Sequence, residues 1–195
     1  RRIQEETPWL DSPFLTPEYT RAVAAVRGDV EVARLEHQGE VVGFLPFQRE
    51  TPGVARSVGL RLSDFTGPVL RRDLAWDPDQ VIRGCELTSW RFTSAPAEHE
   101  ALRTHQFRST ESPSVDLTGG FRAYVEARRR AGSELIQQVQ RKRRKIEREV
   151  GPLRFEWHTT DQAAFDLLLH LKAEQRRRTK TRDLLQNRWA TDLLE

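Results

Sequence analysis

The side chains best placed for chemistry in this sequence are an aspartate in a predicted turn and a histidine beside a tryptophan. Asp64 lies in the string LSDFTGP, between a predicted strand end and a turn, where a carboxylate can orient or deprotonate an amine acceptor. Trp90 with Phe92 can wall a substrate cleft. Trp157 can do the same beside His158, whose imidazole can accept a proton near neutral pH. The structural alternatives are an aspartate that accepts turn N–H groups and aromatic side chains that alternate into a core.

Two runs of basic residues, at 141–148 and 176–182, are the most conspicuous charge feature. Such runs are often solvated helix faces. Their functional alternative is binding of a phosphate-bearing or nucleotide-linked substrate. For that role we single out Arg143, Arg144, Arg177 and Arg178.

A non-enzymatic nucleic-acid- or phosphate-binding module that uses the basic helix is therefore the competing class of function. Nucleic acid is the less favoured partner, because the basic residues of the first run encircle their helix without interleaved aromatic residues. The sequence also has no helix-turn-helix, zinc-finger or RNP signature.

Composition predicts a globular protein of the reducing cytoplasm. The 195 residues are 37% hydrophobic and 31% charged, with a net charge of +3. Cys85 is the single cysteine, which excludes an intramolecular disulfide and a cysteine-based zinc site. The histidines show no metal-ligand spacing, so we assign no metal. No apolar run approaches the roughly 20 residues that cross a bilayer, and the first ten residues contain no apolar signal core.

Local signals in the first part predict an α/β or α+β sheet built on antiparallel hairpins. Thr16, Pro17 and Glu18 form a helix start, and Gly28 closes that helix. Two β-rich runs flank the pair Gln38 and Gly39, which indicates a hairpin. Further strands are expected in VARSVGL, at the end of LSDFTGPVL and in SWRFTSA, with helices at about 77–87 and 96–105.

The second part is predicted to be mainly helical. FRAYVEARRR forms one helix, and SELIQQVQRKRRKIEREVG forms another, capped by Ser133 and stopped by Gly151 and Pro152. LRFEWHT is predicted as a strand, and Asp161 as the cap of a strongly apolar helix. The basic helix carries a narrow apolar stripe of Leu135, Val139, Ile146 and Val150.

The sequence is expected to be partial. It contains no Met, and NRWATDLLE begins an amphipathic helical pattern without a C-cap signal.

Six strings, taken in order and spacing, resemble the CelD-like group of GNAT-superfamily acyltransferases, also described as having a BioF2-like acetyltransferase domain. They are SPFLTPEY, EVVGFLPFQR, VGLRLSDFTGPVL, SPSVDLTGGFRAYV, KIEREVGPLRFEWH and QRRRTKTRDLLQNRWATDLLE. The resemblance covers nearly the whole chain and implies a largely antiparallel mixed sheet flanked by helices. By likeness to the FemAB peptidyltransferases, it also implies two GNAT-like halves. Residues 1–118 would be an N-terminal GNAT-like domain, 119–152 connecting helices, and 153–195 the start of a second GNAT-like domain.

The resemblance implies transfer of an acyl group from acyl-CoA, such as acetyl-CoA, to a small-molecule or nucleotide-linked acceptor. The acceptor would attack the thioester directly through an amine or hydroxyl, without a covalent enzyme intermediate. Likeness to CelD-like proteins points to polysaccharide or cell-envelope metabolism. The basic runs would then bind phosphate of coenzyme A, of the acceptor, or of an aminoacyl-tRNA as in FemAB-like enzymes.

GNAT enzymes bind the donor pyrophosphate on backbone N–H groups of a glycine loop at a helix N-terminus. The nearest string here is RRAGSE, in which Arg129 and Gly132 fit but Glu134 replaces a small residue and would repel phosphate. Either the donor loop lies outside this chain, which is the alternative we favour, or this protein is a degenerate family member that has lost the chemistry. We expect this stretch alone to be inactive.

Overall fold

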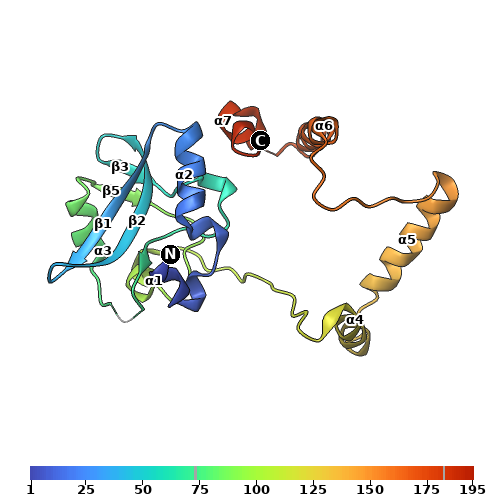
Figure 1. The fold of residues 1–195 in the computed structure, drawn as a ribbon, viewed down its shortest axis with the longest axis horizontal. Coiled ribbons are helices and arrows are strands. Elements are labelled where there is room, and N and C mark those ends of the chain that lie inside the picture. Colours follow the sequence, from blue (N-terminus) through green and yellow to red (C-terminus); the bar gives the residue numbers. More distant parts are fainter. Residues whose placement is uncertain (73, 182) are drawn as a thin grey trace. The chain divides into compact units, whose positions relative to one another are not determined.

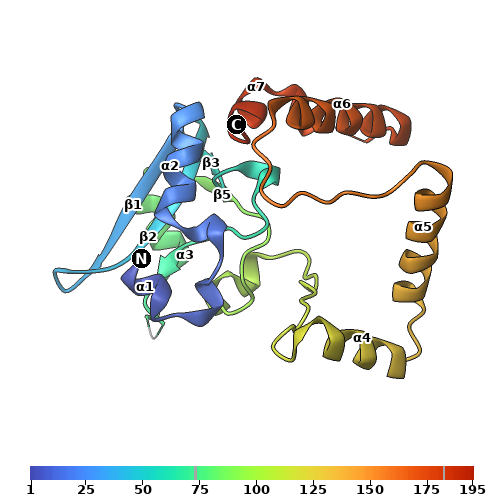
Figure 2. The ribbon, with the colours of Figure 1, turned by 45° about the vertical axis from the view of Figure 1, so that its right-hand side comes forward.

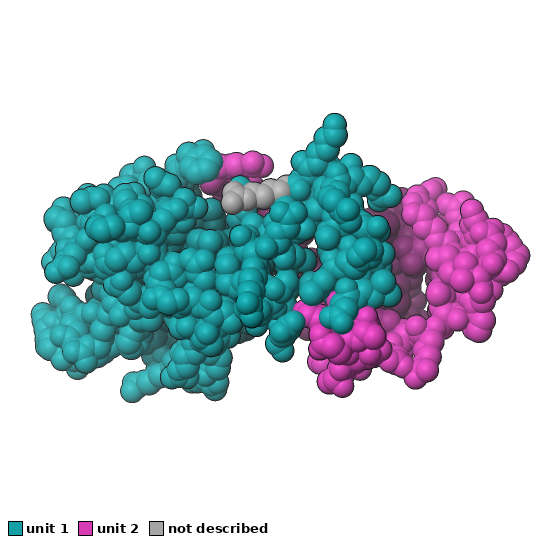
Figure 3. All heavy atoms as spheres, turned by 90° about the horizontal axis from the view of Figure 1, so that it is seen from above, with its two compact units in different colours: residues 1–107, 166–195 teal, residues 108–165 magenta. Residues whose placement is uncertain are grey.

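The computed structural model describes residues 1–72, 74–181 and 183–195. Its contacts group the chain into two compact units, one of residues 1–107 with 166–195 and one of residues 108–165 (Figure 3). Each unit is described by itself below.

The first unit contains a mixed sheet of five strands flanked by helices, which confirms the predicted fold class. The long strand β2 pairs antiparallel with β1, β3 and β4, and β3 pairs parallel with β5 (Figure 1). The strands are β1 (Val30–His37), β2 (Glu40–Thr51), β3 (Val54–Arg56), β4 (Val69–Leu70) and β5 (Ser89–Arg91).

The β1–β2 hairpin turns at the predicted residues. Gln38 and Gly39 both have positive φ, 53° and 82°, as a two-residue type I′ turn requires. The pairing runs from His37 opposite Glu40 to Val30 opposite Gln48, with one irregularity after Leu35. The predicted hairpin is confirmed.

Helices α2 (Pro17–Val26) and α3 (Pro78–Gly84) flank the sheet (Figures 1 and 2). The Thr16 hydroxyl accepts the N–H of Tyr19 at 3.2 Å, which confirms the predicted cap of α2. Shorter elements complete the unit before residue 107. They are α1 (Arg2–Glu5) and the 3-10 helices Pro8–Leu10, Pro13–Leu15, Leu60–Leu62 and Glu100–His105, the last within the predicted helix 96–105.

The core lies on the face of the sheet that carries alternate residues of β2. Leu45 and Phe47 are buried there, and Val81 and Ile82 of α3 pack against their cluster. Period-two alternation in a strand places such residues on one face. The other buried members of this cluster are Ala55, Leu87, Trp90 and Leu102.

The rest of the described chain consists of helices joined by segments without regular secondary structure. Asp161 accepts the N–H of Ala163 at 3.0 Å, which confirms the predicted cap of α6. The elements are α4 (Gly120–Arg130), α5 (Leu135–Glu149), α6 (Gln162–Thr179), the 3-10 helix Leu184–Gln186 and α7 (Arg188–Asp192).

The strand predicted at LRFEWHT is wrong, because residues 153–156 have no regular secondary structure and 157–158 form a bend. A strand needs a neighbour to satisfy its backbone groups. Among the described residues, no strand pairs with this segment. The β-rich composition of this segment therefore does not produce a strand.

The close approach of β4 to β2 requires a glycine at position 43, opposite Leu70 in the register. A Cβ there would lie 2.7 Å from the Val69 carbonyl oxygen and would overlap the Leu70 side chain. We predict that Gly43→Ala lowers the free energy of unfolding by about 1–3 kcal/mol through overpacking.

Gly28→Ala is the matched control for this variant, because a Cβ at Gly28 meets nothing within 4 Å. Urea denaturation measures both variants. An unfolding midpoint of Gly43→Ala equal to that of Gly28→Ala would contradict the stated role of Gly43.

Candidate functional site

Asp64 lies on a loop of the first unit, and the residue before it, Ser63, is anchored by hydrogen bonds. Asp64 itself is exposed, whereas Ser63 is buried. The Ser63 hydroxyl donates to the Val58 carbonyl at 2.7 Å and lies 2.8 Å from the Tyr19 hydroxyl. Since the single Ser63 proton is used on Val58, Tyr19 is the donor in the second bond. Asp64 is thus a solvent-accessible carboxylate held next to a fixed hydroxyl pair.

The Tyr19 phenol responds electrostatically to this arrangement. Burial raises the pKa of Tyr19, the hydrogen bond with Ser63 acts in the opposite direction, and the Asp64 carboxylate adds to the rise. Tyr19 therefore stays protonated and serves as a hydrogen-bond donor.

Gly59 makes room for this cluster. It has a φ of +75°, and a Cβ there would overlap the hydroxyl oxygens of both Ser63 and Tyr19. Its N–H donates to the buried Gln48 side chain at 2.8 Å. Sequence reasoning missed Tyr19 and Ser63, because they lie 44 positions apart. Gly59, which lies shortly before the string LSDFTGP, was the sequence feature that could have indicated this close packing.

The aromatic residues singled out from the sequence have different environments. Trp90 is 8% exposed in the core cluster, with its ring 5.0 Å from that of Phe92 and its buried Nε1 without a hydrogen-bond partner among the described residues. In the second unit, Trp157 is 76% exposed and meets His158 edge to face at 5.2 Å. Asp64 and His158 belong to different units.

In the basic helix α5, charged side chains and the apolar stripe lie on different faces. Arg143 Nε lies 2.9 Å from Glu147 Oε1, whereas Arg144 has no carboxylate within ion-pair distance among the described residues. At 100° per residue, Arg144 is opposite the stripe that contains Val139 and Ile146. Both of these stripe residues remain exposed. Of the second basic run, Arg177 and Arg178 lie in the last turn of α6, and Arg182 is outside the described residues.

The string RRAGSE runs from the last turn of α4 to Glu134, the N-cap of α5. Gly132 has a φ of +75°, as is common just after a helix. Its N–H donates to the Arg129 carbonyl at 3.0 Å, and the Ser133 N–H donates to the Arg128 carbonyl at 3.0 Å. The Gly132 and Ser133 amides are therefore already bonded within the end of α4 and are not free for a pyrophosphate.

His99 is a buried histidine in the first unit. Its ring meets Trp9 edge to face at 4.6 Å and Trp76 at 6.2 Å, and its Nε2 has no hydrogen-bond partner among the described residues. Burial lowers the pKa of His99 to about 4, with a smaller opposing effect from the Pro68 backbone. The imidazole is therefore neutral at physiological pH.

Within residues 1–72, 74–181 and 183–195, no group of three His, Cys, Asp or Glu side chains could hold a metal ion. In the same part of the chain, every helix is too short or too polar to span a membrane.

Comparison with known proteins bears on the helical part of the chain. Residues 133–195 match the family model described as an acetyltransferase (GNAT) domain. The matched region runs from just before α5 to the last residue and includes both basic runs. No curated protein matches the chain. No solved structure matches it either.

The low pKa of His99 predicts a specific loss of stability in acid. The pKa of this histidine is 6.5 in the unfolded chain and about 4 in the folded protein. The contribution of His99 to the free energy of unfolding is therefore fully present above pH 6.5 and is lost as the pH falls to 4. The loss should approach about 3 kcal/mol. His99→Phe, which cannot be protonated, should lack this component.

The measurement is the free energy of unfolding from urea titrations at several values between pH 7.5 and 4. The carboxylates titrate in both proteins, so the difference between wild type and variant isolates His99. Parallel pH profiles of the two proteins would rule out the assigned origin.

Proposed function

We propose that this protein transfers an acyl group from acyl-CoA to an amine or hydroxyl acceptor. The observation that carries the proposal is the match of residues 133–195 to the acetyltransferase (GNAT) domain, which supports acyl transfer in general. The mixed α/β fold of the first unit agrees with it. The finer proposal, from the resemblance, is an N-acyltransferase of the CelD-like group that acts on a polysaccharide or cell-envelope precursor in the cytoplasm.

Asp64 is the proposed group that orients or deprotonates the acceptor. Its carboxylate is exposed, so an acceptor can reach it, and the loop before it is fixed by the Ser63 and Tyr19 hydrogen bond. A positioned carboxylate contributes to the transition state when it takes a proton from the attacking amine. His158 of the second unit is the other candidate base.

We propose that the acceptor attacks the thioester directly, because the single cysteine of the chain is poorly suited to act as a nucleophile. Cys85 is the single cysteine, and burial raises the pKa of its thiol. A thiol with a raised pKa is a poor nucleophile at neutral pH. The proposal therefore has no acyl-cysteine intermediate.

The exposed arginines are the proposed phosphate ligands. Arg144, Arg177 and Arg178 have no ion-pair partner among the described residues. Arg143 already pairs with Glu147 and would exchange that partner for a phosphate. Guanidinium groups bind phosphate through charge-assisted hydrogen bonds, so these residues fit the phosphates of coenzyme A or of a nucleotide-linked acceptor.

We predict that Asp64→Asn lowers kcat/KM by about 10²–10⁴ in the complete gene product, because the amide cannot take a proton from the acceptor. Asp11→Asn, an exposed aspartate of the same unit, is the control and should keep wild-type activity. Release of the CoA thiol in the presence of amine acceptors reports the rate. Wild-type kcat/KM in Asp64→Asn would remove Asp64 from the mechanism and leave acyl transfer itself standing.

The double variant Arg143→Gln/Arg144→Gln should raise KM for the phosphate-bearing substrate and leave kcat nearly unchanged. Each lost charge-assisted bond costs about 1.5–3 kcal/mol. Arg34→Gln is the control, because Arg34 is an exposed arginine on β1 paired with Glu36. If the double variant kept the wild-type KM, α5 would be scaffold rather than a phosphate site.

A further inference from the structure

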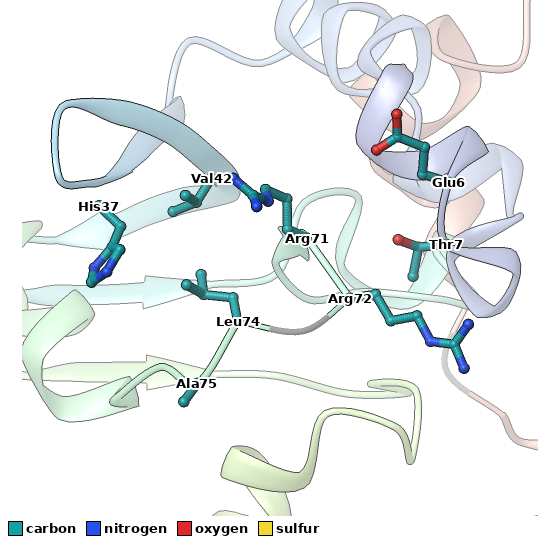
Figure 4. A pocket seen from close by; sticks show the side chains of 8 residues that line it. All are labelled: Glu6, Thr7, His37, Val42, Arg71, Arg72, Leu74 and Ala75. Carbon is teal, nitrogen blue, oxygen red and sulfur yellow. The ribbon is translucent and has the colours of Figure 1, made fainter.

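A pocket of about 580 Å³, whose lining does not include Asp64, opens in the first unit (Figure 4). This volume is typical of sites for small metabolites. Its lining comes from the end of α1, the β1–β2 hairpin and the segment after β4. The described lining residues are Glu6, Thr7, His37, Val42, Arg71, Arg72, Leu74 and Ala75.

The backbone fixes Arg71 at this place. β4 pairs with β2, and the Arg71 N–H donates to the Val42 carbonyl at 3.0 Å. The two successive arginines therefore leave the sheet at one defined point. Figure 4 shows Arg71 directed toward the hairpin and Arg72 directed away from it.

The uncompensated charge of the pocket is positive. Arg71 makes an ion pair with Glu40 at 3.2 Å, but both side chains are more than half exposed. Glu6 is already paired with Arg2 at 3.0 Å. Among the described residues, no carboxylate lies within ion-pair distance of Arg72. An exposed guanidinium of this kind has its donors available for an anion.

Thr7 supplies an independent polar group in the same pocket. The residue is 1% exposed, and its Oγ1 has no hydrogen-bond partner among the described residues. Buried hydroxyls nearly always have partners, so an unpartnered one calls for an explanation. Figure 4 shows the Thr7 oxygen on the side of the residue that faces Arg71.

We propose that this pocket binds a small organic anion. Its carboxylate or phosphate group would accept hydrogen bonds from Arg72 and from the Thr7 hydroxyl, which would give that hydroxyl its missing partner. Val42 and Leu74 line the pocket as well and would contact an apolar part of the ligand. This site lies wholly in the first unit, outside the matched GNAT region, and does not depend on the proposed acyl transfer.

Calorimetric titration of the complete gene product with benzoate and with phenyl phosphate tests the proposal. Each probe joins one anionic group to the same apolar ring, so the tighter one identifies the preferred anion. Arg72→Gln should weaken binding at least tenfold, since it removes the charged donor while leaving an exposed side chain. Arg61→Gln, an exposed arginine of the same unit outside the pocket, should bind like wild type.

The variant Thr7→Val distinguishes a direct effect on ligand binding from an effect on protein stability. The variant keeps the shape of the side chain and removes a hydroxyl that has no partner, so its Tm should not fall. Its affinity for the probes should fall several-fold. Binding that is weakened in both Arg72→Gln and Thr7→Val supports the site. Absence of binding at millimolar concentrations of either probe, or wild-type affinity in both variants, overturns it.

Discussion

The first unit depends on the pairing of β2 along both of its edges. Near its start, Gly43 lets β4 approach closely, and near its end the buried Gln48 joins two other segments. The Gln48 amide donates to Asp29 at 3.0 Å and accepts the Gly59 N–H at 2.8 Å. Both candidate sites follow from this strand. The Gly59 loop leads to Asp64, and β4 leads directly to the arginines of the anion pocket.

Acidic residues are in excess in the first part of the chain and basic residues in the second, and the proposed roles of the two parts differ accordingly. Residues 1–107 contain 13 basic and 16 acidic residues, whereas residues 108–195 contain 19 basic and 13 acidic ones. The basic part includes the region that matches the acetyltransferase domain. Phosphate binding is therefore proposed for α5 and α6, and acceptor chemistry for the Asp64 loop, where a carboxylate is exposed beside fixed hydroxyls.

The features that the sequence predicted are those set by neighbouring residues. Thr16 and Asp161 cap their helices by bonding to N–H groups two or three positions later, and Gln38 with Gly39 provides the turn. The strand expected at 153–159 failed because a strand depends on a partner that local sequence does not specify. The other features that were not predicted from the sequence depend on contacts between distant residues. The orphaned hydroxyl of Thr7 and the burial of His99 arise only when segments far apart in the chain pack together.

In the proposed reaction the acyl group leaves a CoA thioester for an acceptor, and carbonyl-labelled acetyl-CoA makes this transfer directly observable. The complete gene product would be incubated with ¹³C-labelled acetyl-CoA and a panel of amine and hydroxyl acceptors, and followed by ¹³C NMR. We expect the thioester carbonyl signal to decay while an amide or ester carbonyl signal grows, only when an acceptor is present. Persistence of the thioester with every acceptor, or its conversion to free acetate alone, would contradict it.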